Sequence, residues 1–126
     1  MKEHVNKTTN PDGSLRPPIP DTCYIDDNAV ISDNARIYGY AVICDNAHIS
    51  DNARISGNAI IFGNAKISDN ALVSGHAQVY GNAVISGHAK ISGDARIYGN
   101  AVISGNAIIC NNNRSVGSRL KFGVKQ

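Results

Sequence analysis

The chain has 126 residues, enough for one domain, and its 12 Lys and Arg against 10 Asp and Glu leave a formal net charge of +2. That charge is too small to favour nucleic acid as a partner, and no apolar segment is long enough to cross a membrane. Three cysteines, an odd number, do not make a disulfide framework, so we expect a reduced, cytoplasmic protein.

The first segment, residues 1–18, is polar and contains Pro11, Pro17 and Pro18. Proline fixes φ and lacks a backbone donor, so it interrupts both helices and sheets. The composition therefore predicts an extended or disordered leader that ends where the first coil of the next segment begins.

A six-residue repeat dominates residues 19–112. Ile or Val stands at every sixth position from Ile31 to Ile109, with Ala two residues earlier, in fourteen consecutive units. Six is a multiple of the strand period of two but not of the helical 3.6, so Ala and Ile stay on one side of an extended chain. Most units then continue with Ser and Asp-Asn or Gly-Asn, residues that accept a sharp corner. The pattern predicts strands and corners wound into a parallel coil.

The run Ile-Ser-Asp-Asn-Ala-Arg, Ile31 to Arg36, and its copies resemble the hexapeptide repeat of left-handed parallel β-helices. The resemblance implies an all-β, single-domain, left-handed parallel β-helix of about five triangular coils of about eighteen residues over residues 19–112. Short, loop-free members of similar sequence occur in bacteria and their viruses. An accessory or inhibitory protein of that origin is one function that the resemblance allows.

The repeat fails in residues 113–126. Asn113 stands where Ala is due and Ser115 where Ile is due, and the basic residues Arg119, Lys121 and Lys125 follow. Because a β-helix has open sheet edges at both ends, we predict that residues 113–126 form either a cap on the last coil or a basic tail.

Residues eighteen apart stack in columns if three hexads make one coil. The columns of the first face then gather large apolar side chains, joined by Arg96, on one surface. These side chains belong to Tyr24, Val42, Cys44, Ile60, Phe62, Tyr80 and Tyr98. Such a patch is typical of an interface, although cross-strand stacking within one chain also accounts for it. Hexapeptide-repeat proteins commonly form trimers, so we predict a non-catalytic module that forms a homotrimer and engages a heterologous protein partner.

A possible catalytic pair lies in the third corner, where His76 falls one coil from Asp94. A His beside a carboxylate can act as a general base, and hexapeptide acyltransferases use a His at a subunit interface. The alternative function is therefore a minimal acyl-CoA-dependent acyltransferase with His76 as its base. Asn, Asp and His also tolerate corner geometry, and no loop interrupts the repeat from Ile25 to Ile109 to build a pocket. We favour the non-catalytic function and predict no cofactor.

The other polar residues suggest two metal hypotheses. His48, His76 and His88 fall in different columns, so we predict no histidine metal site. Asp33, Asp51 and Asp69 stack in the second corner. Their repulsion is relieved either by a cation or by Arg36 and Arg54, which follow two of them by three residues.

Overall fold

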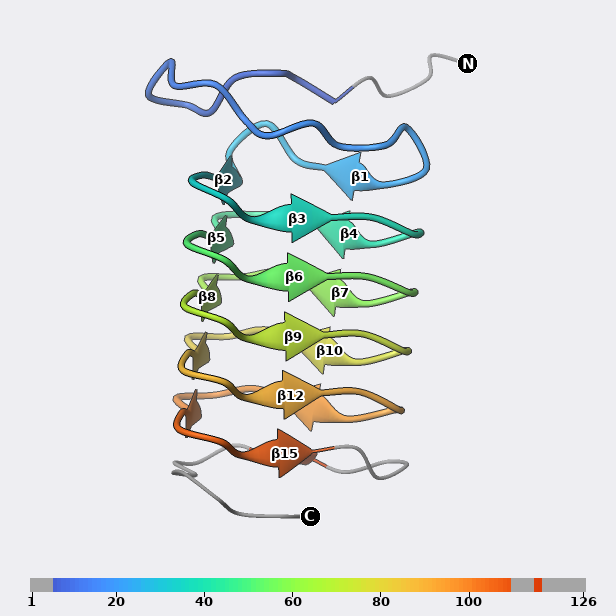
Figure 1. Ribbon diagram of the computed structural model, residues 1–126, viewed down its shortest axis with the longest axis vertical. Helices are drawn as coiled ribbons and strands as arrows, with labels where there is room; N and C mark the ends of the chain where they lie inside the picture. The colour runs from blue at the N-terminus through green and yellow to red at the C-terminus, as the bar shows by residue number, and fades with distance from the viewer. Residues whose placement is uncertain (1–5, 110–114, 117–126) are drawn as a thin grey trace.

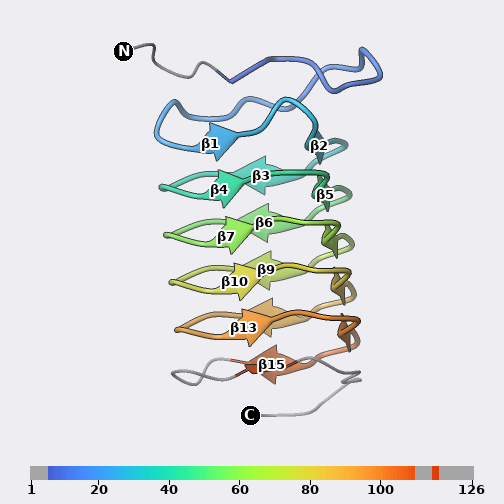
Figure 2. The same cartoon turned by 180° about the vertical axis from the view of Figure 1, so that it is seen from behind.

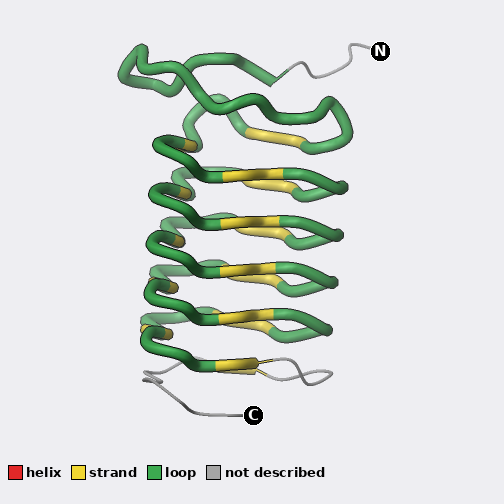
Figure 3. Tube along the Cα trace, viewed as in Figure 1, coloured by secondary structure: helices red, strands yellow, loops and turns green. Residues whose placement is uncertain are grey.

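The computed structural model describes residues 6–109 and 115–116, and within these residues all regular secondary structure is β (Figures 1 and 3). Each strand contains two residues, so most of the chain between strands is corner. The strands are β1 (Tyr24–Ile25), β2 (Val30–Ile31), β3 (Arg36–Ile37), β4 (Val42–Ile43), β5 (His48–Ile49), β6 (Arg54–Ile55), β7 (Ile60–Ile61), β8 (Lys66–Ile67), β9 (Leu72–Val73), β10 (Gln78–Val79), β11 (Val84–Ile85), β12 (Lys90–Ile91), β13 (Arg96–Ile97), β14 (Val102–Ile103), β15 (Ile108–Ile109) and β16 (Ser115–Val116).

Every strand pairs in parallel with the strand three places away, which builds three sheets. The first sheet has the order β1-β4-β7-β10-β13-β16, the second β2-β5-β8-β11-β14 and the third β3-β6-β9-β12-β15. In Figure 1 the front strands run to the right while the chain descends, and in Figure 2 the strands on the opposite side do the same, so the coil is left-handed. The predicted all-β, left-handed parallel β-helix is confirmed.

The repeat produces this coil because its Ile and Ala side chains bury themselves. From Ile25 to Ile109, each inward Ile, Val or Ala is at most 2% exposed. Backbone hydrogen bonds then join successive coils on either side of each buried residue, as where Val30 N donates to Ala47 O and Ser32 N to Ile49 O, both over 2.9 Å. One unit cannot bury its own Ile, so the core exists only as a stack.

The corners depend on residues that accept positive φ. Asp33, Asp51 and Asp69 adopt φ values of 59°, 58° and 59° in the second corner. Each carboxylate accepts a hydrogen bond from the next coil: Asp51 N donates to Asp33 over 3.3 Å, and Asp69 N donates to Asp51 over 3.2 Å. Gly87 N donates to Asp69 over 2.9 Å. The column is therefore a ladder of side-chain to backbone hydrogen bonds.

The sequence predicts two ways to relieve the repulsion among the stacked Asp side chains, and the ladder shows that neutralisation by Arg36 and Arg54 is the wrong one. Among the residues that the structure describes, the only ion pair joins Lys7 and Asp27, with 3.7 Å between Nζ and Oδ2. Backbone N–H groups, rather than the guanidinium groups, supply the partners of the stacked carboxylates.

Residues 6–18 lie across the first coil (Figure 1), and their side chains form hydrogen bonds with backbone groups of β1, β2 and the corner between them. The Asn6 side chain donates to Cys23 O and accepts from Ile25 N, both over 2.8 Å. Buried Arg16 donates to the carbonyl oxygens of Asp26 and Ala29 over 3.1 and 2.7 Å. The leader is thus a hydrogen-bonded cap, a role that its proline content did not indicate.

At the other end, β16 extends the first sheet by one strand. Ile97 pairs with Val116, whereas earlier partners on this sheet are eighteen residues apart, as for Val79 and Ile97. β16 therefore pairs with β13 at a separation one residue longer than that between earlier strands of this sheet. The rest of the predicted basic tail, residues 113–114 and 117–126, lies outside the described residues.

Candidate functional site

The first sheet carries a row of stacked aromatic rings on its outer surface. The Phe62 and Tyr80 ring centroids are 4.8 Å apart with planes 3° from parallel, and those of Tyr80 and Tyr98 are 5.7 Å apart at 18°. Parallel register produces the stack, because β7, β10 and β13 place these residues at the same point of successive coils. Offset stacking of this kind is favourable within one chain.

Around the stack, the same register aligns Tyr24 with Val42 and Val42 with Ile60. We call the outer surface of the first sheet the aromatic face. It consists of Tyr24, Val42, Cys44, Ile60, Phe62, Tyr80, Arg96 and Tyr98, all of which were predicted as interface residues. Tyr24 and Tyr98 are 39% and 37% exposed, while Phe62 and Tyr80 are half-buried by their ring neighbours. The structure thus assembles the patch, and its use as an interface stays a prediction.

His76 and Asp94 occupy successive positions of the third corner, as the sequence predicts. His76 N donates to Gly93 O over 2.8 Å, and both side chains are exposed. The ion pairs found among the described residues do not include this pair. A catalytic role for either residue stays a prediction, and neither lines the groove described below.

No three His, Cys, Asp or Glu side chains within residues 6–109 come together as a set that could hold a metal ion. The stacked Asp33, Asp51 and Asp69 accept hydrogen bonds from backbone N–H groups, which relieves their repulsion without an ion.

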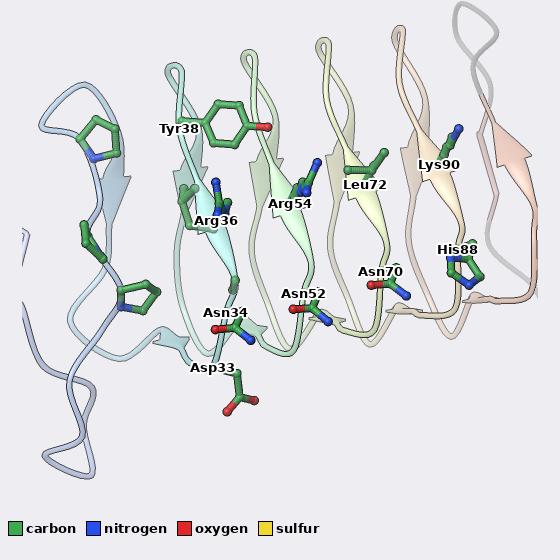
Figure 4. Close-up of a pocket in the computed structure, with 15 residues that line it drawn as sticks. Asp33, Asn34, Arg36, Tyr38, Asn52, Arg54, Asn70, Leu72, His88 and Lys90 are labelled. Atoms are coloured by element: carbon green, nitrogen blue, oxygen red, sulfur yellow. The ribbon is translucent and has the colours of Figure 1, made fainter.

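A groove of about 1080 Å³ runs along the outer surface of the third sheet (Figure 4). Its floor is the column Arg36, Arg54, Leu72 and Lys90, from β3, β6, β9 and β12, together with Tyr38. The three cationic side chains are exposed, and Tyr38 is 43% exposed. Sequence reasoning did not single out this surface. The signal was present in the column of basic residues at eighteen-residue spacing.

The side wall of the groove is a ridge of polar corner side chains, and its upper end is closed by the leader. The ridge consists of Asn34, Asn52, Asn70 and His88, at the second position of the second corner in successive coils. Pro17, Pro18 and Pro20 line the upper end. The groove therefore runs along the coil axis, and its lining mixes charged, amide and apolar groups.

The coil, its three parallel sheets and its loop-free corners define a β-solenoid repeat protein. The repeat of the YdcK beta-solenoid family matches residues 29–45, 47–63, 53–66, 77–93, 89–105 and 95–111, more than half of the chain. The chain belongs to that family. No curated protein and no solved structure matches it. Among the described residues, no helix is long and apolar enough to cross a membrane.

Proposed function

We propose that this protein is a non-catalytic binding module that self-associates through its aromatic face, with a homotrimer as the expected assembly, and engages another protein. The observation that carries the proposal is the Phe62–Tyr80–Tyr98 stack. Large aromatic side chains are favoured anchors of protein interfaces because they bury much apolar area with few rotatable bonds.

Apolar neighbours extend the stack into a patch that water solvates poorly. Val42, Cys44 and Ile60 lie beside it on the same sheet surface, each partly exposed. Burial of Cys44, with the charges of Asp26 and Asp45, raises the pKa of its thiol, so it stays neutral at pH 7. A large exposed apolar patch of this kind, here bordered by the charged Arg96, is typical of an interaction site.

Light scattering on the double variant Phe62→Asp/Tyr80→Asp tests the self-association. We expect the wild-type chain to be an oligomer and the variant a monomer, because two carboxylates at the centre of the patch would be desolvated in the interface. The matched control is Ser68→Asp/Ser86→Asp, which follows Ile67 and Ile85 in the same two coils of the second sheet. The control should keep the wild-type mass.

Two outcomes would contradict the proposal. A wild-type mass for the aromatic double variant would show that the face is not the self-interface. Stabilisation by acetyl-CoA in a thermal shift assay, together with acyl transfer that His76→Ala abolishes, would favour the acyltransferase instead.

A further inference from the structure

We propose that the groove over the third sheet is the partner-binding surface and that it takes an extended acidic segment of another protein, rich in Asp and Glu. This inference deepens the proposed function, since it names the class of partner and the surface that binds it. It requires only that the third sheet stays open when the aromatic face is covered.

The first argument is uncompensated charge. Arg36 pairs directly with Arg54 in the register of the third sheet, and Lys90 lies two strands further along the same column. None of the three forms an ion pair with a described residue. Like charges on directly paired strand residues destabilise a sheet, so this column raises the free energy of the fold unless an anion neutralises it.

The stacked carboxylates of the second corner do not neutralise this cationic column. The Asp33, Asp51 and Asp69 carboxylates bond to backbone N–H groups of the next coils. Figure 4 shows Asp33 pointing away from Arg36 and Arg54, on the far side of the amide ridge. Asp33 thus lines the groove only at its edge, and Asp51 and Asp69 do not line it. Three cations against one carboxylate leave the groove with net positive charge.

The shape and lining of the groove favour a peptide. From Arg36 to Lys90 the column spans three strand spacings, or about 14 Å, which an extended peptide crosses in about four or five residues. The Asn34, Asn52 and Asn70 amides along the wall can donate to and accept from a peptide backbone. Leu72, half-buried in the middle of the cationic column, offers an apolar contact for a side chain of the segment.

Nucleic acid fits the same surface less well. Single strands are held by successive aromatic side chains on which bases stack, whereas the two aromatic rings of the described lining, Tyr38 and His88, lie on different coils and do not form a row. The three cations would neutralise few phosphates. An oligonucleotide is therefore the competing ligand that the experiment must include.

The test is fluorescence anisotropy with a labelled poly-glutamate peptide of about ten residues, long enough to exceed the groove at about 3.3 Å per residue. We expect binding that weakens as salt is added. The variant Arg36→Gln/Arg54→Gln should weaken it about tenfold, as expected for loss of two charge-assisted contacts. The control Lys7→Gln/Lys66→Gln removes the same net charge from exposed sites outside both the groove and the aromatic face, and it should change affinity less than about twofold.

A charge-reversed variant, Arg36→Glu/Arg54→Glu, keeps the test decisive if the neutral variant folds poorly. It should lose the poly-glutamate peptide and gain binding of a poly-lysine peptide of equal length. The inference is overturned if the wild type does not bind poly-glutamate, if both Gln variants weaken binding equally, or if a single-stranded oligonucleotide of equal charge binds more tightly. Light scattering on the same variants separates the two proposals, because groove substitutions should leave the oligomer intact.

Discussion

The side-chain amide of Asn10 takes the place of a neighbouring strand for Ile31 of β2. Asn10 Nδ2 donates to Ile31 O, and Ile31 N donates to Asn10 Oδ1, both over 2.8 Å. Arg16 Nε also donates to Asn10 Oδ1 over 3.1 Å, and Asn10 is 3% exposed. Backbone groups at the open end of the coil are thus satisfied by one buried side chain.

Asn10→Ala should destabilise the protein by about 2–4 kcal/mol, because it leaves buried donors and acceptors without partners. The free energy of unfolding from urea titration measures the loss. Asn64→Ala is the control, since Asn64 is exposed and its amide reaches only Asn82 over 3.4 Å. The control should cost less than about 0.5 kcal/mol. Equal costs would show that the leader is not an energetic cap.

Gly57→Ala should destabilise the coil more than Gly13→Ala. Both glycines have positive φ, 64° and 91°. A Cβ at Gly57 would lie 2.8 Å from Gly75 N in the next coil, whereas nothing lies within 4 Å at Gly13. Left-handed geometry costs alanine about 1–2 kcal/mol at either site, and the clash between coils should add about 1–3 kcal/mol at Gly57.

Thermal and urea unfolding of the two glycine variants measure that difference. The pair isolates the clash because the conformational cost is common to both. Equal destabilisation would mean that neighbouring coils separate easily to admit a methyl group.

Stability should fall in alkaline solution, in part through Cys23. Burial raises the pKa of the Cys23 thiol above its ordinary value of 9.0, so the folded state disfavours the thiolate. This contribution is fully present below pH 9.0 and is lost as the pH rises through the folded-state pKa.

The variant Cys23→Ala restores the alanine that the repeat places at this inward position, and it should flatten the decline in unfolding free energy above pH 9.0. Cys44→Ser, which alters an outward thiol, should retain the Cys23 part of the decline. Urea titrations across this range measure both profiles. An unchanged slope for Cys23→Ala would assign the decline to other groups.

Much of the fold could be predicted by counting residues along the repeat. The period of six places every buried Ile and Ala correctly, and the period of eighteen brings Phe62, Tyr80 and Tyr98 into one column, because parallel register repeats without an insertion. The resemblance to hexapeptide-repeat proteins supplied the left-handed, three-sided form. The same counting also places Arg36, Arg54 and Lys90 in one column, but from the sequence we considered only Arg36 and Arg54, as partners of nearby Asp residues.

The sequence by itself determined the coil, its core and its three unequal faces, since these follow from a strictly local repeat. The tertiary structure decided the hydrogen-bond partners of the polar side chains, which the repeat does not specify. The Asp33 carboxylate bonds to the backbone of the next coil instead of Arg36, and Asn10 and Arg16 fold back to close the sheet edges. Such contacts depend on the directions in which individual polar side chains point, and a repeat specifies only spacing.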